Sequence, residues 1–200
     1  MKTPPSPQRK AVAKHVLNMF KGKPEVHAYY DEAETRSISV ITTLGTIEDG
    51  IKSVGTIGLS EARLLGKDGN EFVTRVELCS AVPKHFDLWE NVVVSAAFFI
   101  EQRKFPILPG AVLENVVREF YPELNMPHLY FSVPFLWNDG HFEEFMFGSI
   151  RINWLQCFSI QEAEKDFIAS RGFESFEDIL SQQEVDIFDM QRPPIDVNKL

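Results

Sequence analysis

The segment that most constrains the fold is "FDLWENVVVSAAFFIEQR", which spans residues 86–103. It is long enough for a helix of several turns, and its apolar residues fall at helical spacing on two sides. One side carries Leu88, Val92, Ala96 and Phe99, and the other carries Val93, Ala97 and Ile100. A helix that is apolar on two sides must be covered by other elements. The segment therefore predicts a central helix in a packed core.

Five other segments have the pattern of β-strands that such a helix can pack against. Residues 36–44 and 73–82 are β-branched and alternate with period two, residues 53–60 form a shorter run, and residues 128–137 and 149–158 follow later in the chain. The first three are expected to be antiparallel neighbours. Pro134 confines its strand to an edge or a bulge because proline cannot donate to a sheet ladder. Gly55 and Gly58 indicate a bulge or a close approach of backbone.

The N-terminal part of the chain predicts one further helix before the strands. Val12, Val16, Met19 and Phe20 lie on one face of a helix from Gln8 to Phe20, and Gly22 supplies its end. Residues 1–9 are expected to be a flexible segment. With 200 residues, residues 10–200 are expected to form a single domain.

The stretch "WLQCFSIQEAEKDF", residues 154–167, predicts a strand that leads into a helix. Ser159 and Glu162 have the S-x-x-E spacing of a capping box, which places a helix at residues 160–171. Gly172 stands where a left-handed residue ends such a helix, and Phe173 can contact Ile168. Ser175 is expected to cap another short helix.

Charge is distributed unevenly along the chain. The net charge is −9, residues 1–23 carry six Lys or Arg and no acid, and residues 139–200 carry thirteen acids against five bases. An acidic surface argues against direct binding of nucleic acid and favours a basic protein as partner, although a merely solvated face is the alternative. The partner-binding residues expected from this pattern are Glu174, Glu177, Asp178, Glu184, Asp186 and Asp189.

No motif in the sequence specifies an active site. Cys157 is interpreted as a small buried residue rather than a nucleophile, since no His lies within 15 residues of it. The five histidines lack metal-ligand spacing, and no nucleotide-binding glycine motif follows a strand. We therefore expect no catalytic residues, no metal and no cofactor. An enzyme whose site forms only in three dimensions, from Cys157 with His85, His128 or His141, is the least favoured alternative.

The N-terminus has no apolar signal region, and no run of about 18 uncharged apolar residues occurs. Cys79 and Cys157 both lie in strand-like runs, which suits reduced thiols. We expect a cytoplasmic protein that neither spans nor binds a membrane.

Taken in order, "TIGLS", "RVELCSAV", the Leu-Trp helix, "VPFLW", "INWLQCFSIQEAEKDF" and "VDIFDMQRPPI" resemble the suppressor of fused-like domain, over about residues 10–195. The resemblance is to its small bacterial members, which act as immunity proteins beside toxins. It implies an α+β fold with a twisted, mostly antiparallel sheet of about five or six strands and packed helices.

The resemblance also implies an antitoxin, or immunity protein, that neutralises a cognate toxin by direct binding. The toxin is expected to be a nuclease with a basic cleft, which the acidic last third of this chain can cover. A general interaction or regulatory module without a toxin partner is the alternative. Animal members have a second domain and a peptide-binding cleft, for which this chain leaves no room.

Overall fold

The structure is a computed structural model that describes residues 4–66, 68–103, 107–137 and 142–196. The described residues form one sheet of eight strands in the order β1-β2-β3-β4-β8-β6-β5, with β7 paired to the first part of β8. The strands are β1 (Glu25–Tyr30), β2 (Ser37–Leu44), β3 (Ile51–Ile57), β4 (Thr74–Pro83), β5 (Val112–Leu113), β6 (His128–Ser132), β7 (Phe145–Phe147) and β8 (Ile150–Ile160).

This architecture confirms the predicted α+β class and the mostly antiparallel sheet. The strand count of five or six was too low, because β1, β5 and β7 were not predicted. The strand predicted over 53–60 ends at Ile57 and is followed by a 3-10 helix, η1 (Leu59–Glu61). The strand predicted over 128–137 ends at Ser132, before Pro134. All pairs are antiparallel except β4 with β8, which runs parallel.

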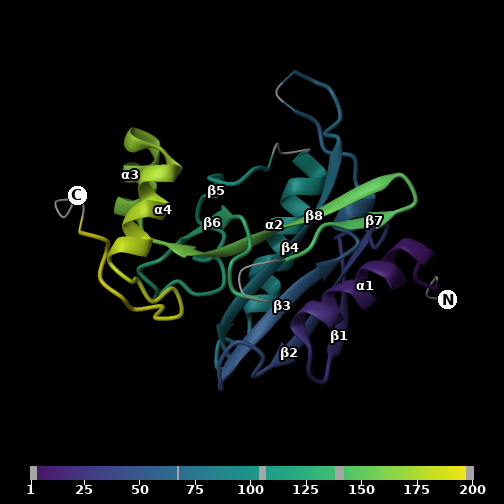
Figure 1. Cartoon of the computed structure of the whole chain (residues 1–200), viewed down its shortest axis with the longest axis horizontal. Coiled ribbons are helices and arrows are strands. Elements are labelled where there is room, and N and C mark those ends of the chain that lie inside the picture. The colour runs from purple at the N-terminus through teal and green to yellow at the C-terminus, as the bar shows by residue number, and fades with distance from the viewer. Residues whose placement is uncertain (1–3, 67, 104–106, 138–141, 197–200) are drawn as a thin grey trace.

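Strand β8 joins the two halves of the sheet. Its first part, Arg151–Gln156, pairs in parallel with β4, and its last five residues pair with β6. Figure 1 shows β8 as the long strand that runs from the four-stranded part beside α1 to the helices at the opposite end of the molecule. Alternate β8 residues therefore face two different sets of helices.

Helices α1 (Pro7–Phe20) and α2 (Trp89–Arg103) cover opposite faces of the sheet. On β2, Val40 packs in the cluster that contains the α2 residues, whereas its neighbour Ile41 packs in the cluster that contains Val12 and Val16 of α1. Gly55 of β3 lets α1 approach closely: a Cβ there would lie 3.0 Å from the Val16 side chain. The close approach at Gly55 is therefore made by side chains of α1, Val16 and Phe20, rather than by another backbone.

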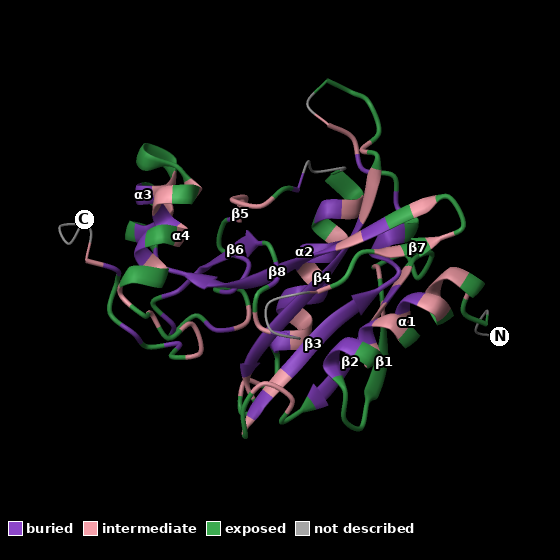
Figure 2. Ribbon diagram, in the orientation of Figure 1, coloured by how far each residue is buried: buried purple, intermediate pink, exposed green. Residues whose placement is uncertain are grey.

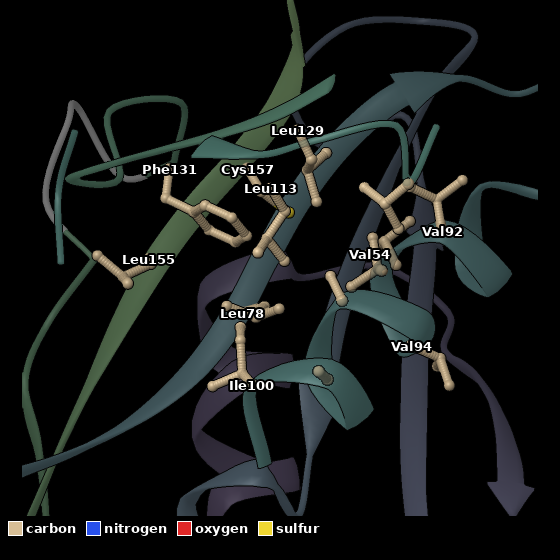
Figure 3. Packing of buried hydrophobic residues seen from close by; sticks show 14 of the residues in the cluster. Val54, Leu78, Val92, Val94, Ile100, Leu113, Leu129, Phe131, Leu155 and Cys157 are labelled. Carbon is tan, nitrogen blue, oxygen red and sulfur yellow. The ribbon is translucent and has the colours of Figure 1, made fainter. Parts of the chain in front are cut away.

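Helix α2 has the central position that its sequence predicts. Seven of its residues are buried, and Val92 and Ile100 pack with Val54 and Leu78 of the sheet (Figure 3). Trp89 belongs to the same cluster. Leu88 and Phe99, which were expected on a buried face, are instead 45% and 42% exposed. Leu88 precedes the first residue of α2, and the Phe99 ring lies beneath the Arg103 guanidinium.

Helices α3 (Glu162–Arg171) and α4 (Phe173–Gln182) pack at the far end of β8. Phe167, Phe176 and Ile179 form a cluster with Tyr130 of β6 and Phe158 of β8. Even-numbered β8 residues contact α1 at one end, through Ile152 and Trp154, and this cluster at the other. Thus α1 and the α3–α4 pair lie on the same face of the sheet at opposite ends, as Figure 1 shows.

The predicted cap of α3 was wrong by two residues. Ser159 belongs to β8, where it pairs with Leu129, and its hydroxyl contacts Met126 and Met190 instead of a helix N-terminus. The cap is Gln161, whose backbone N–H donates to the Glu164 carboxylate over 2.9 Å. Sheet pairing of Ser159 outweighs its local preference for a cap.

The end of α3 follows the prediction in part. Gly172 has a φ of +88° and its N–H donates to the Ile168 carbonyl, but its ψ of 159° lies outside the left-handed helical region. Helix α4 begins at Phe173, so Ser175 is not its cap; the Ser175 hydroxyl donates to the Arg171 carbonyl.

The C-terminal segment is held against α3 by a buried ion pair. Arg192 donates two hydrogen bonds to the Glu164 carboxylate, and both side chains are almost completely buried. The Gln161 side chain donates to the Arg192 carbonyl, and Gln183 exchanges two hydrogen bonds with Asp196. The segment after α4 is therefore fixed to the domain.

Of the N-terminal segment expected to be flexible, residues 1–3 lie outside the described residues and residues 7–9 form the start of α1. The Ser6 hydroxyl caps this helix by accepting from the Arg9 N–H. Among the described residues, no helix has the length and apolar character needed to span a bilayer.

Candidate functional site

A groove of about 680 Å³ lies between α4, the segment that follows it and the segment that follows β6. Its walls are mainly apolar. They are formed by Val133, Pro134, Phe135, Leu136, Phe158, Leu180, Val185, Ile187 and Phe188. A volume of this size is within the range that proteins use to hold ligands or side chains of a partner.

One wall exists because β6 cannot continue past Ser132. Pro134 lacks the N–H that a ladder needs, and the Phe135 N–H donates to the Gln156 side chain of β8 at 3.0 Å instead of to a backbone carbonyl. The chain leaves the sheet here with Val133 63% exposed and Phe135 47% exposed. Two large apolar side chains therefore remain open to solvent. Most of β3, by contrast, is coloured as buried in Figure 2.

The other wall is built by α4 and the turn after it. Phe176 and Ile179 point into the core, which leaves Glu177, Leu180 and Ser181 on the side that faces the groove. The turn is closed by the Val185 N–H, which donates to the Leu180 carbonyl at 3.0 Å. Glu184 lies in this turn with a φ of +48°.

Three of the six acids predicted to bind a partner lie around this groove: Glu177, Glu184 and Asp186. Glu177 is half-buried, and one of its oxygens accepts from the Tyr130 hydroxyl at 2.8 Å. Burial, together with this carboxylate, raises the pKa of Tyr130 above its ordinary value. Asp186 accepts from the Phe188 N–H, so one acid of the rim is fixed by its own loop.

The other three predicted acids do not line the groove. Glu174 and Asp178 are exposed on α4, one helical turn apart, and Asp189 is exposed in the segment after it. They extend the acidic surface around the groove without forming part of its walls.

Cys157 has the packing role that the sequence suggested. It is fully buried in the cluster with α2, and burial raises the pKa of its thiol to about 12. Of the histidines considered with it, His128 bonds Asn115 and Glu162 through its two ring nitrogens, His85 contacts the Phe86 ring, and His141 lies outside the described residues. In the described part of the chain, no three His, Cys, Asp or Glu side chains are grouped to hold a metal ion.

Two buried polar groups on β6 and β8 have no hydrogen-bond partner among the described residues. They are the Ser132 hydroxyl and the Gln156 side-chain nitrogen, on residues that pair across β6 and β8. Ser132 lines the groove and is only 3% exposed. Sequence reasoning did not identify the groove, because residues 133–136 of its wall were interpreted as part of a strand and nothing in the sequence brought them beside residues 180–188. Pro134 was the one signal of an interruption.

The sequence and the fold match one family of known proteins. The family model described as "Suppressor of fused protein (SUFU)" matches residues 34–193. Immunity protein YqcF of Bacillus subtilis (strain 168) is 31% identical over 188 residues, which cover 94% of this chain and 97% of the relative.

Solved structures with much lower identity share the fold. A SUFU homologue from Neisseria gonorrhoeae FA 1090 superposes with a TM-score of 0.73 at 16% identity, covering 94% of this chain and 96% of that one. The Sufu–Fu complex gives 0.66 at 12% identity, covering 96% and 91%. Drosophila Suppressor of Fused gives 0.68 at 11% identity, and the match covers 95% of this chain but only 51% of that one. The match of the family model over most of the chain shows that this protein belongs to the suppressor of fused family.

Proposed function

We propose that this protein is an immunity protein that neutralises a cognate toxin by binding it directly in the cytoplasm. The observation that carries the proposal is the 31% identity, over nearly the full length of both chains, to a protein named as an immunity protein. The solved Sufu–Fu complex supports a protein partner in a second member of the fold.

The distribution of charge supports a nuclease as the toxin. A nuclease must attract a phosphate backbone and so presents a basic surface. The acids on α4 and the segment after it offer the opposite charge beside an apolar groove. Interfaces combine such parts: a buried apolar centre supplies affinity, and charges around it increase the rate of association.

The test is protection by the purified protein against a candidate toxin encoded by a gene beside its own. The two chains should form a stable complex, and the complex should have lost the toxin's activity on nucleic acid. Growth of cells that express the toxin should recover when this protein is co-expressed. A toxin that remains fully active in the presence of excess folded protein would contradict the proposal.

The alternative, an interaction module without a toxin partner, predicts a different result. It would bind a partner other than the neighbouring gene product and give no protection. The growth assay therefore separates the two functions, because only the immunity protein restores growth.

A further inference from the structure

The groove beside α4 combines three features that together specify what can occupy it. Its walls are apolar, its rim carries Glu177, Glu184 and Asp186, and the unpartnered Ser132 hydroxyl lines it. An occupant must therefore offer a large apolar body, positive charge beside it and a polar group at its tip.

The apolar walls come from both sides. Val133 and Phe135 are exposed large hydrophobic residues on the β6 side, and Leu180 and Val185 face them from α4 and its turn. Exposed apolar side chains gathered in one concave site are typical of a binding surface, whereas single exposed ones are not. The groove is too large for one methyl-sized contact and has room for an aromatic ring.

The buried Ser132 hydroxyl further restricts which side chain can occupy the groove. Ser132 is 3% exposed, and its hydroxyl has no partner among the described residues, which is unfavourable unless a ligand supplies the hydrogen bond. Tyrosine and tryptophan have an apolar body with one polar end, and they are enriched among the side chains that dominate binding energy at interfaces. Phenylalanine or leucine would fill the walls and leave the Ser132 hydroxyl unpartnered.

The rim determines the residues that flank this side chain. Three carboxylates around the opening favour Lys or Arg on either side of the inserted ring and disfavour acids. We propose that the groove holds one tyrosine or tryptophan side chain of a short basic segment of the toxin, with its polar tip bonded to Ser132. This proposal rests on the proposed function, since it names the part of the toxin that is bound.

The test uses synthetic peptides, so it does not depend on which toxin is the partner. The acetylated, amidated peptide KKYKK is titrated into the isotope-labelled protein and followed by NMR. It should shift the backbone signals of Val133, Leu180 and Val185, and it should bind at least about tenfold more tightly than KKAKK, because a buried ring removes apolar area from water. Equal affinity of the two peptides would mean that only the acidic rim attracts them and would overturn the proposal.

Two serine variants separate the groove from the rest of the acidic surface. Ser181→Trp fills the groove from an exposed position on α4, whereas Ser170→Trp adds the same ring to an exposed position on α3 outside the groove. The first variant should lose the preference for KKYKK over KKAKK, and the second should keep it. If both variants show the same preference for KKYKK over KKAKK, insertion into the groove is contradicted.

The role of Ser132 has its own readout. The wild-type protein should prefer KKYKK to KKFKK, and Ser132→Ala should bind the two peptides equally, which a purely structural role of Ser132 would not produce. If the groove instead binds a second copy of this chain, the protein should form a concentration-dependent dimer that Ser181→Trp abolishes. This result would also overturn the proposal.

The failure of this proposal differs from the failure of the proposed function. If KKYKK occupies the groove but no toxin is neutralised, only the function is wrong. If Ser181→Trp protects cells from the toxin as well as the wild-type protein does, the function stands and the groove is not the binding site.

Discussion

Cys157 is a packing residue, as its sequence context without a nearby His indicated. Its thiol is fully buried between β8 and α2, and its raised pKa keeps it protonated at neutral pH. We expect Cys157→Ser to lower the free energy of unfolding by about 1–3 kcal/mol, because it buries a hydroxyl in place of a thiol. Toxin neutralisation should be unchanged.

Urea unfolding and the growth assay together check this prediction. A Cys157→Ser protein that folds normally and no longer protects against the toxin would show that the thiol takes part in function.

His15 gives the fold a dependence on pH. Its ring stacks on Trp154 with 4.8 Å between centroids, and its Nε2 contacts the Glu143 carbonyl. Burial lowers the pKa of His15 below 6.5, although the carbonyl of Glu143 partly opposes the shift. Protonation is then easier in the unfolded chain, so stability present above pH 6.5 is lost as pH falls below that value.

The measurement is the urea midpoint at a pH above 6.5 and at a pH below it, for the wild-type protein and for His15→Phe. The wild-type midpoint should fall more on acidification than that of the variant, which has no group to protonate at this position. The same fall in both proteins would show that His15 is not responsible.

The junction of β8 with α3 shows where local sequence signals for elements fail. Ser159 and Gln161 each precede a Glu by three residues, and Ser is the stronger cap in isolation. Only the pairing of Ser159 with Leu129 decides between them, and that partner lies 30 residues earlier.

Among the described residues, the Ser159 hydroxyl bonds only methionine sulfurs, which are weak acceptors. Ser159→Ala should therefore lower the free energy of unfolding by less than the roughly 1 kcal/mol that a lost cap costs. A urea-unfolding loss of a full cap's magnitude would contradict this assignment.

The contribution of the buried Glu164–Arg192 ion pair to stability can be compared with that of a neighbouring exposed acid. Glu164→Ala leaves the Arg192 charge buried and should lower the free energy of unfolding by about 3–5 kcal/mol. The control is Asp166→Ala, two residues further along α3, which removes an exposed acid and should cost about 0–1 kcal/mol. If urea unfolding shows similar losses of unfolding free energy for the two variants, the buried pair does not fix the C-terminal segment.

Elements with strong periodicity were predictable, and those defined by distant partners were not. Strands β2 and β4 and helices α1 and α2 carry clear alternation or helical spacing. Strand β1 is almost fully exposed, so its sequence has no apolar alternation to detect. The parallel pairing of β4 with β8 joins segments more than 70 residues apart, and no local pattern encodes it.

At the scale of the whole molecule, charge and shape are arranged along one axis. Figure 1 places α1, which belongs to the basic N-terminal part, at one end of the long axis, and α3 and α4 at the other. The proposed basic partner would be attracted to the acidic end and repelled by the basic end. The acid-rich C-terminal part was evident from the sequence, but the groove was not, because its walls combine residues 132–136, Phe158 and residues between 177 and 188.

The central claim is that the acidic end recruits a basic toxin. It is tested most directly by the association rate of the purified complex at low and at physiological ionic strength. The triple variant Glu174→Lys, Asp178→Lys, Glu184→Lys reverses exposed acids at this end, and the control Glu25→Lys, Glu48→Lys, Asp49→Lys reverses three exposed acids on β1 and the β2–β3 turn. Both triples change the net charge equally.

Each variant should remain folded, because exposed charges contribute only about 0–1 kcal/mol per pair. At low salt the first triple should slow association by about tenfold or more and weaken its salt dependence, while the control should change it far less, since steering depends on where the charge lies. Unaltered association kinetics in the first triple, or equal slowing in both, would contradict the claim that this acidic surface guides the toxin to the protein.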